Sequence, residues 1–181
     1  MKLYRFSPIA DKAQLLEAIK AAHLGCFRLC KQSLGHYLPI AGNMGIFCHY
    51  DEEYERLIAI RKEMAETSNN FNQKYFKLHE PIVIPAEGDV PETTYTYLYI
   101  RRPDPYRAQI GDVDFVLSVE EYAKLKESLQ SGTKIKGARI FERADLDMVE
   151  LHDPDIDALA YINVQSMAEA VRVKLSDATN L

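Results

Sequence analysis

Hydrophobic positions along the chain change their spacing several times, and each change predicts a new element of secondary structure. A short alternating stretch, Lys2 to Phe6, predicts a strand. After Asp11 the apolar residues recur every three or four positions, which predicts one long helix that Gly25 could interrupt. The positions that define this helix are Leu15, Ile19, Ala22, Cys26 and Leu29. Gly35 and Pro39 end this first region.

The next pattern is a strand, a helix and two further strands. The apolar stretch from about Gly45 to Tyr50 predicts the first strand, and a helix is expected from Asp51 to Glu66, with acidic residues in its first turn where the helix dipole favours them. The segments Lys74 to Pro85 and Thr93 to Arg102 then have the composition of strands. Pro81 predicts an edge position or a bulge for the former, and not a central position in the sheet.

A second unit follows in the same order. A strand is expected from Val113 to Ser118 and a helix from Val119 to Gln130, which Gly132 ends. Three strands are expected after it, at about Ala138 to Arg143, Met148 to Leu151 and Ala158 to Val164. For the tail from Gln165, the sequence is compatible with either a short helix or a frayed end.

An internal sequence similarity supports the interpretation that the chain contains two related units. The segment from Phe47 to Leu57 is identical at five of eleven positions to the segment from Phe115 to Leu125. Related units pack their sheets against each other, and the seam between them is a natural place for a ligand. A chance match of two glutamate-rich helix starts is the alternative.

The expected fold class is therefore α+β, with two related strand-helix-strand-strand(-strand) units packed together and an N-terminal helical extension. With 181 residues, of which 47% are hydrophobic, the chain is long enough to bury a sizeable core as one compact globular domain. The expected divisions are 1–42 for the N-terminal strand and helical extension, 43–105 for the first unit, 106–164 for the second and 165–181 for the tail.

Charge and cysteine content bear on location and partners. The formal net charge is −5 without a long run of one sign, which disfavours nucleic acid as a partner. The start of the chain lacks the pattern of a leader, and no apolar stretch is long enough to span a bilayer. Cys26, Cys30 and Cys48 are few and odd in number, which suits a reducing compartment. We expect a cytoplasmic protein without membrane contact, and a homo-oligomer stays open.

The second unit resembles a module of a known superfamily. The strand from Val113 to Val119, the helix after it and the turn His152-Asp153-Pro154-Asp155 resemble one module of the vicinal oxygen chelate superfamily, which includes glyoxalases, bleomycin-resistance proteins and extradiol dioxygenases. The likeness lies in the order of elements and in that turn. It extends from Gly45 to Val164 if both units are counted.

The resemblance implies a binding role without the metal of that superfamily. Its metalloenzymes place a histidine near the start of the first strand of a module and a glutamate on the last strand. In this chain Phe47 and Phe115 stand at the first position, and Leu98 and Ala160 stand at the second. None of these side chains is a metal ligand, so ligand binding or a scaffold role is favoured over metal catalysis.

The candidate binding residues lie mainly on two strands. Alternation places Tyr95, Tyr97, Tyr99 and Arg101 on one face of the strand from Thr93, where they could bind a flat anionic or aromatic ligand by stacking and a bidentate contact. The alternative is a sheet face of packed rings and a solvated charge.

Two aspartates on the following strand are the other candidates. Asp112 and Asp114 point to the face opposite Val113, where they could hold a cation or pair with Arg101 and Arg102. The solvated ion pair is the alternative. His49 and His79 complete the candidate lining of a cleft between the units.

Two further clusters contain metal-ligand residue types. His23, Cys26 and Cys30 share a helix face, but their spacing matches no zinc pattern and a buried free cysteine usually packs as a small apolar residue. An acidic cluster has oxygen donors, although Pro154 favours a solvated turn. Its members are Glu150, His152, Asp153, Asp155 and Asp157. We expect no metal at either cluster.

The sequence contains no complete catalytic set. A glycine-rich phosphate loop and a nucleophile elbow are both missing, so no cofactor is expected and it stays open whether the protein is an enzyme. The favoured interpretation is a small-molecule-binding protein whose cleft lies between the two units, with its chemistry unassigned. The alternatives are a non-catalytic protein-interaction or scaffold protein, and single-stranded nucleic-acid binding through the Tyr/Arg sheet face.

Overall fold

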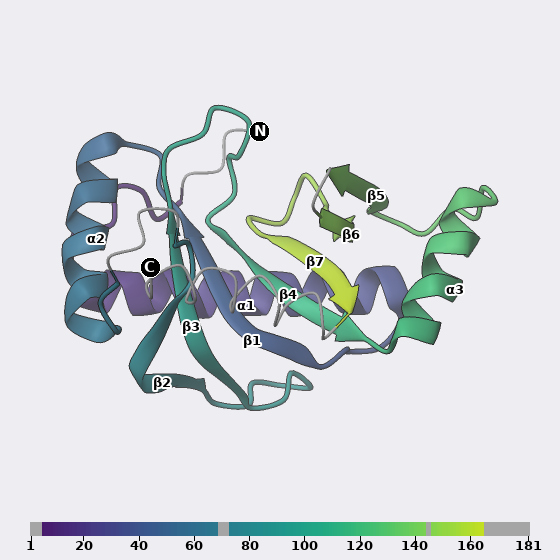
Figure 1. Ribbon diagram of the computed structural model, residues 1–181, viewed down its shortest axis with the longest axis horizontal. Coiled ribbons are helices and arrows are strands. Elements are labelled where there is room, and N and C mark those ends of the chain that lie inside the picture. The colour runs from purple at the N-terminus through teal and green to yellow at the C-terminus, as the bar shows by residue number, and fades with distance from the viewer. Residues whose placement is uncertain (1–4, 69–72, 144–145, 165–181) are drawn as a thin grey trace.

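Seven strands form one mixed sheet in the computed structural model, which describes residues 5–68, 73–143 and 146–164 (Figure 1). The strand order is β2-β3-β1-β4-β7-β6-β5. In chain order the strands are β1 (Ile40–Phe47), β2 (Phe76–Ile84), β3 (Thr93–Arg101), β4 (Gly111–Leu117), β5 (Ala138–Arg143), β6 (Leu146–Leu151) and β7 (Leu159–Val164). With three helices, α1 (Lys12–Leu34), α2 (Asp51–Met64) and α3 (Val119–Gln130), this confirms the predicted α+β class.

The chain forms two units, each of which begins with a strand and a helix and continues with further strands. The first is β1-α2-β2-β3 and the second is β4-α3-β5-β6-β7, so the first has one strand fewer. In each unit the first strand pairs in parallel with the last, β1 with β3 and β4 with β7. The two first strands, β1 and β4, pair antiparallel with each other and join the units. We call this β1–β4 pairing the seam.

Helix α1 is the N-terminal extension, and it is continuous. Its first turn is capped by Asp11, whose side chain accepts a hydrogen bond from the Gln14 amide at 2.9 Å. The break considered at Gly25 does not occur. A methyl group at position 25 would lie 2.8 Å from Ala158 Cβ, so the glycine allows the helix to pack closely on the chain before β7.

The three helices pack on the same face of the sheet. Leu15 and Ile19 of α1, Leu57 of α2 and Tyr122 of α3 belong to one buried cluster with inward residues of β1 and β4. We call this side the helix face. In Figure 1, α1 runs behind the strands, so the view is onto the opposite side, which we call the polar face.

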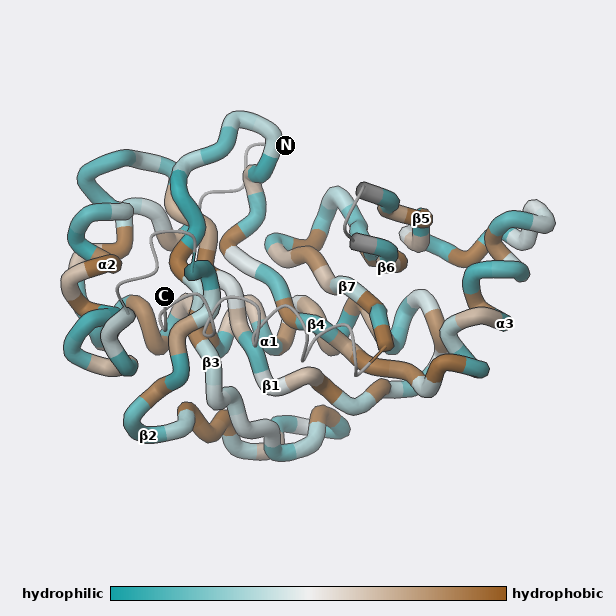
Figure 2. Tube along the Cα trace, in the orientation of Figure 1, coloured by the Kyte–Doolittle hydropathy of each residue, from teal (hydrophilic) through white to brown (hydrophobic). Residues whose placement is uncertain are grey.

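Amphipathic patterns explain why these elements form. Hydrophobic and hydrophilic residues alternate along the helices in Figure 2, as expected for helices with one face on a core. The capping box of α3 is complete, because Ser118 accepts from the Glu121 amide and Glu121 accepts from the Ser118 amide. Helix α2 begins at Asp51 as predicted and ends at Met64, two residues before the expected end.

Several predicted boundaries need correction. Strand β1 begins at Ile40, five residues before the expected Gly45, and ends at Phe47, while β4 begins at Gly111. Strand β2 lies at the edge of the sheet, as Pro81 predicted. The predicted strand from Lys2 falls mainly outside the described residues, and its described part, Arg5 and Phe6, is not in a strand. The tail from Gln165 lies outside the described residues.

Phe47 and Phe115 do not occupy equivalent positions. Phe115 faces the helices, and its ring centroid is 5.2 Å from that of Phe27 in α1. Phe47 belongs to a separate cluster on the polar face, with Leu159 and Tyr161. When the two similar segments are aligned, the starts of α2 and α3 coincide, but the strands before them are offset by an odd number of residues. Because side chains alternate along a strand, the aligned phenylalanines point to opposite sides of the sheet.

None of the helices in the described ranges has the length and apolar character needed to cross a membrane.

Candidate functional site

Two rows of side chains cross the polar face. Directly paired residues of neighbouring strands point to the same side of a sheet. One row follows the register from Tyr99 through Gly45 and Asp112 to Leu159, across β3, β1, β4 and β7. The other follows the register Asp114–Tyr161–Glu150–Arg139 across β4, β7, β6 and β5. The two aspartates of β4 therefore lie beside the seam, one in each row.

Asp112 fills the space left by a glycine on the neighbouring strand. A Cβ at position 45 would lie 2.0 Å from Asp112 Oδ1. Only glycine leaves room for the carboxylate there, so Gly45 and Asp112 form a matched pair across the seam. The two residues come from different units, 67 positions apart in the chain.

The surroundings of Asp112 favour its protonated form. Burial, and after it the negative charge of Asp114, raise the pKa of Asp112 from 3.8 to about 8. Arg101 and Arg107 act in the opposite direction without reversing the effect. In the described part of the chain, Asp112 forms no ion pair. Asp112 is consequently a carboxyl group that gains or loses a proton near neutral pH.

Asp114 is held across the seam by Asn43. The Asn43 side-chain amide donates a hydrogen bond to Asp114 Oδ2. The β1–β4 register is irregular between Ile40 and Met44, which leaves three residues of β1 opposite one of β4. Gly42, with φ 84°, permits the bulge that brings Asn43 to Asp114.

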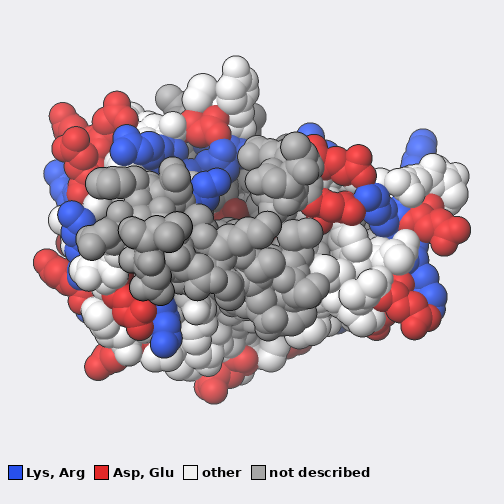
Figure 3. All heavy atoms as spheres, viewed as in Figure 1, with Lys and Arg blue, Asp and Glu red and all other residues white. Residues whose placement is uncertain are grey.

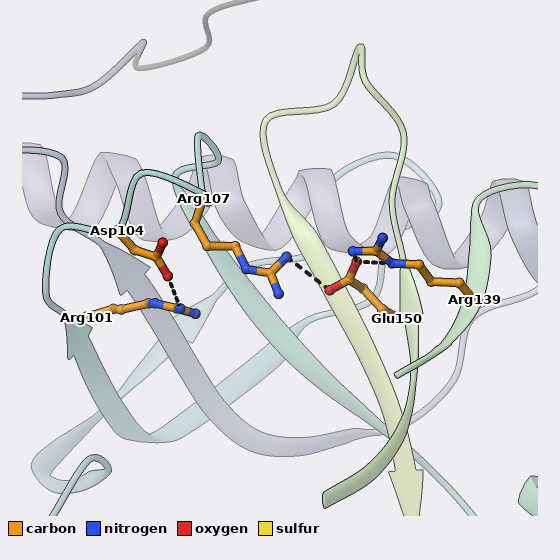
Figure 4. A network of polar contacts seen from close by, with 5 residues as sticks. All are labelled: Arg101, Asp104, Arg107, Arg139 and Glu150. Carbon is orange, nitrogen blue, oxygen red and sulfur yellow. Dashed lines mark hydrogen bonds and ion pairs between the residues drawn. The ribbon is translucent and has the colours of Figure 1, made fainter. Parts of the chain in front are cut away.

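Arg101, Arg107 and Glu150, whose charges act on Asp112, belong to the arginine–carboxylate pairs drawn in Figure 4. Glu150 is fully buried and accepts from Arg107 at 3.1 Å and from Arg139 Nε at 2.8 Å. Arg101 pairs with Asp104, and its guanidinium lies 5.1 Å from the centre of the Phe47 ring. Each of these three arginines therefore already has a carboxylate partner.

The tyrosine row is divided between the two faces. Tyr97 and Tyr99 pair with Asn43 and Gly45 and share the polar face with them. Tyr99 also contacts Tyr75, with 5.4 Å between ring centroids, and burial raises its pKa. The prediction that Tyr95 shares this face is wrong.

Tyr95 instead lies in the core under α1. It is fully buried, and its hydroxyl is 2.8 Å from His23 Nδ1. The side-chain alternation of β3 changes phase between Tyr95 and Leu98, beside an irregular register with β2. Such an irregularity cannot be read from residue types alone.

The remaining predicted binding residues lie elsewhere. His49 lines a pocket of about 690 Å³ with Pro8 and Arg56, and its Nδ1 is 2.6 Å from Ser7 Oγ. His79 lines a separate groove of about 620 Å³. Arg102 is exposed, with its guanidinium 4.6 Å from the centre of the Tyr54 ring. The structure does not bring these three residues to the polar face.

Neither cluster considered for a metal forms a ligand set. Within the described ranges, no group of three or more His, Cys, Asp or Glu side chains is arranged to hold a metal ion. The thiols of α1 donate to backbone oxygens, Cys26 to Leu159 at 3.0 Å and Cys30 to His36 at 3.4 Å. The expectation of a solvated acidic loop is wrong for Glu150, which is buried in β6.

Three residues of the site escaped the sequence interpretation, Asn43, Gly45 and Arg107, and a fourth, Glu150, was considered only as part of a solvated acidic loop. Glu150 carried a usable signal, because in a strand of alternating side chains it shares a face with Met148, which points to burial. The others gave none, since their roles depend on the register across the seam and on the loop before β4.

Charges of both signs are interspersed over this side of the molecule. Figure 3 shows Lys and Arg side chains beside Asp and Glu side chains on the part of the surface that is not drawn in grey, without a large area of one sign. The visible surface therefore lacks the extended basic stripe that binds a nucleic-acid backbone.

Comparison with known proteins identifies the fold and no family. No family model matches the chain, and no curated protein matches it. A solved structure titled "Structural Genomics, Protein EC4020" has a TM-score of 0.53 and 16% sequence identity, covering 94% of this chain and 98% of that chain. At this identity the match shows a shared fold.

Two further matches are to variants of an enzyme of the vicinal oxygen chelate superfamily, the methylmalonyl-CoA epimerase of Streptomyces coelicolor, each in complex with 2-nitronate-propionyl-CoA. Their TM-scores are 0.33 and 0.32, with 14% and 15% identity, and both cover 70% of this chain and 99% of that chain. These scores are too low to support a functional inference. Membership of the superfamily stays a prediction, based on the β4-α3-β5-β6-β7 order of the second unit.

Proposed function

We propose that this protein binds a small molecule across the seam, and that Asp112 changes its protonation state when the ligand binds. The observation that carries the proposal is the position of Asp112. Its carboxyl group lies on the polar face above Gly45, where the two units meet, and has a pKa of about 8. Perturbed carboxyl groups of this kind cluster at functional sites.

A purely structural role does not account for an aspartate at this position. A carboxyl group that burial keeps protonated near neutral pH destabilises the fold whenever it ionises. Asparagine has the same shape and never ionises. An aspartate is useful here because it can accept or donate a proton at neutral pH, as in general acid–base chemistry.

The neighbouring side chains provide contact surface for a ligand. Tyr97 and Tyr99 lie on the polar face on one side of the seam, and Tyr161 lies on the other side, paired with Asp114. Aromatic rings beside a few polar groups are the usual lining of a small-molecule site. Asp112 and Asp114 lie between these rings and supply polar contacts.

The protonation state of Asp112 can be tested directly. Carbon-13 NMR of protein labelled at the aspartate carboxyl groups should contain one resonance that titrates near pH 8, and the D112N variant should lack it. D155N, which removes an exposed carboxylate, should leave that resonance unchanged. An Asp112 resonance that titrates near pH 4 would contradict the proposal.

Ligand binding is tested by thermal shift against a library of cationic, neutral and anionic metabolites. A ligand of this site should shift the melting temperature in wild type, with a dependence on pH that D112N removes. A flat response across the library, or hits that are indifferent to D112N, would count against the proposed site.

A further inference from the structure

A serine and a histidine from distant parts of the chain are hydrogen-bonded beside a pocket. Ser7 Oγ lies 2.6 Å from His49 Nδ1, although the two residues are 42 positions apart. His49 lines a pocket of about 690 Å³ together with Pro8, the residue after Ser7. The described lining of this pocket includes neither Asp112 nor Asp114, so the pair is separate from the seam.

A buried glutamate fixes the positions of the serine and the histidine. The side chain of Glu53 is 1% exposed, and its Oε2 accepts from the backbone amide of His49 at 2.7 Å. Its Oε1 accepts from the backbone amide of Ile9 at 2.8 Å. These two bonds fasten the segment that contains Ser7 to the turn that contains His49. A hydroxyl and a base that are held together in this way need little further ordering before they react.

The histidine has the charge state of a general base at neutral pH. Burial lowers the pKa of His49, and the negative charges of Glu53 and Asp157 oppose this effect without reversing it. A neutral imidazole with its proton on Nε2 accepts the Ser7 proton at Nδ1. The two carboxylates then stabilise the positive charge that the ring acquires.

The first turn of α2 supplies amide donors to the same pocket. Tyr50 is the N-cap residue of this helix, and its side chain makes no capping hydrogen bond. Among the described residues, no acceptor binds the backbone amides of Asp51, Glu52 and Glu53. All four residues line the pocket. Unpaired amides at the start of a helix can stabilise the oxyanion that forms during acyl transfer.

We propose that Ser7 and His49 are a nucleophile and its base, which hydrolyse small carboxylic esters in this pocket. Ser7 Oγ forms a bond to the acyl carbon and passes its proton to His49 Nδ1. The bond between the acyl carbon and the alcohol oxygen then breaks, and the alcohol leaves with that proton. Water repeats both steps on the acyl-serine, which releases the carboxylic acid and restores the hydroxyl and the neutral ring.

The charges of the pocket restrict the class of ester. Its described lining has three carboxylates, of Asp51, Glu52 and Glu53, and one guanidinium, of Arg56. This net negative charge disfavours an ester that itself carries a carboxylate or a phosphate. The substrate is therefore a neutral or cationic ester.

A biotinylated fluorophosphonate tests whether Ser7 is a nucleophile. Ser7 Oγ displaces fluoride from the phosphorus, and mass spectrometry of the digested protein locates the modified residue. Wild type should be labelled at Ser7, and Ser7→Ala should lose the label. His49→Gln cannot accept the proton, so it should be labelled roughly 100-fold more slowly, as expected for loss of a general base. Ser131→Ala is the control, because Ser131 is exposed and donates to a backbone oxygen, and it should be labelled like wild type.

Two chromogenic acetates then test turnover and charge preference: neutral p-nitrophenyl acetate and anionic 4-acetoxy-3-nitrobenzoate. After correction for uncatalysed hydrolysis, wild type should cleave the neutral ester faster. Ser7→Ala and His49→Gln should each lower this rate by roughly 100-fold or more. The proposal is overturned if wild type is not labelled at Ser7, if His49→Gln is labelled as fast as wild type, or if the anionic ester is cleaved at least as fast as the neutral one.

A purely structural hydrogen bond gives a different result. Ser7→Ala would then lower the melting temperature, while wild type would not be labelled at Ser7. Because the wild-type protein is itself labelled and mapped, this outcome is recognised even if a variant fails to fold.

Discussion

The carboxylate of Asp112 occupies the space above Gly45 that any other side chain at position 45 would need. The two residues are directly paired across the β1–β4 seam, and a Cβ on residue 45 would lie 2.0 Å from Asp112 Oδ1. Each unit therefore contributes half of this arrangement. The glycine leaves room for a carboxyl group that has no ion-pair partner among the described residues.

The first prediction concerns this pair. Gly45→Ala should destabilise the protein by about 1–3 kcal/mol, because the methyl group forces Asp112 out of its position. Urea denaturation measures the change in free energy of unfolding. In an Asp112→Ala background the same Gly45→Ala change should be much less destabilising. Equal losses in both backgrounds would show that the steric conflict is not with Asp112.

The second prediction is a dependence of stability on pH. The pKa of Asp112 is about 8 in the folded protein and near its ordinary value in the unfolded chain, so the folded state holds the extra proton between these values. Stability from this group should be fully present below about pH 4 and decrease towards pH 8, by up to about 1.4 kcal/mol per pH unit.

Asp112→Asn should flatten that decrease and make the protein more stable than wild type at about pH 9, since no charge is buried. The midpoints of urea unfolding at several pH values provide the comparison. Asp155→Asn is the control and should keep the wild-type slope, because Asp155 is exposed. If D112N kept the wild-type slope, the assignment of this pH dependence to Asp112 would be wrong.

The third prediction ranks the two arginines of Glu150. Arg107 has a side chain 12% exposed, whereas that of Arg139 is 62% exposed, and Glu150 is fully buried. Arg107→Ala should cost about 3–5 kcal/mol, because a buried charge loses its more deeply buried partner. Arg139→Ala should cost about 1 kcal/mol or less, as for exposed ion pairs. Chemical denaturation of both variants gives the ranking, and the reverse order would contradict the burial argument.

The fourth prediction concerns Tyr95 in the core. Tyr95→Phe removes the hydroxyl that lies 2.8 Å from His23 Nδ1, and His23 Nε2 has no partner already. The buried imidazole would then lack both hydrogen bonds, so we expect a loss of about 1–3 kcal/mol. Thermal unfolding measures it. The matched change Tyr106→Phe, at a side chain that is 89% exposed, should have almost no effect.

Sequence patterns were sufficient where an element depends on its own residues. Helix α3 and strand β5 have the bounds that the sequence predicted, because a complete capping box starts α3 and Gly132 and Gly137, both with positive φ, punctuate the chain between them. Pro81 correctly indicated an edge strand, since proline cannot donate to a neighbouring strand. The positions of Asp112 and Asp114 on one face of β4 also followed from alternation.

The site itself depended on contacts that alternation cannot supply. Asn43 reaches Asp114 because of a bulge in β1, and Tyr95 leaves the tyrosine row because the alternation of β3 changes phase. Both events are set by the neighbouring strand. Phe47 and Phe115 have matching sequence contexts but lie on opposite faces, because the strands before α2 and α3 are offset by an odd number of residues.

By itself the sequence determined the class of the fold, the order of its elements and which aspartates share a side, because these depend on local propensity and residue spacing. Only the tertiary structure decided that Gly45 lies under Asp112, that Glu150 is buried between two arginines and that Asn43 orients Asp114. Those relationships join residues about 11 to 71 positions apart in the sequence. They are fixed by strand register and burial, which arise only when the whole sheet is assembled.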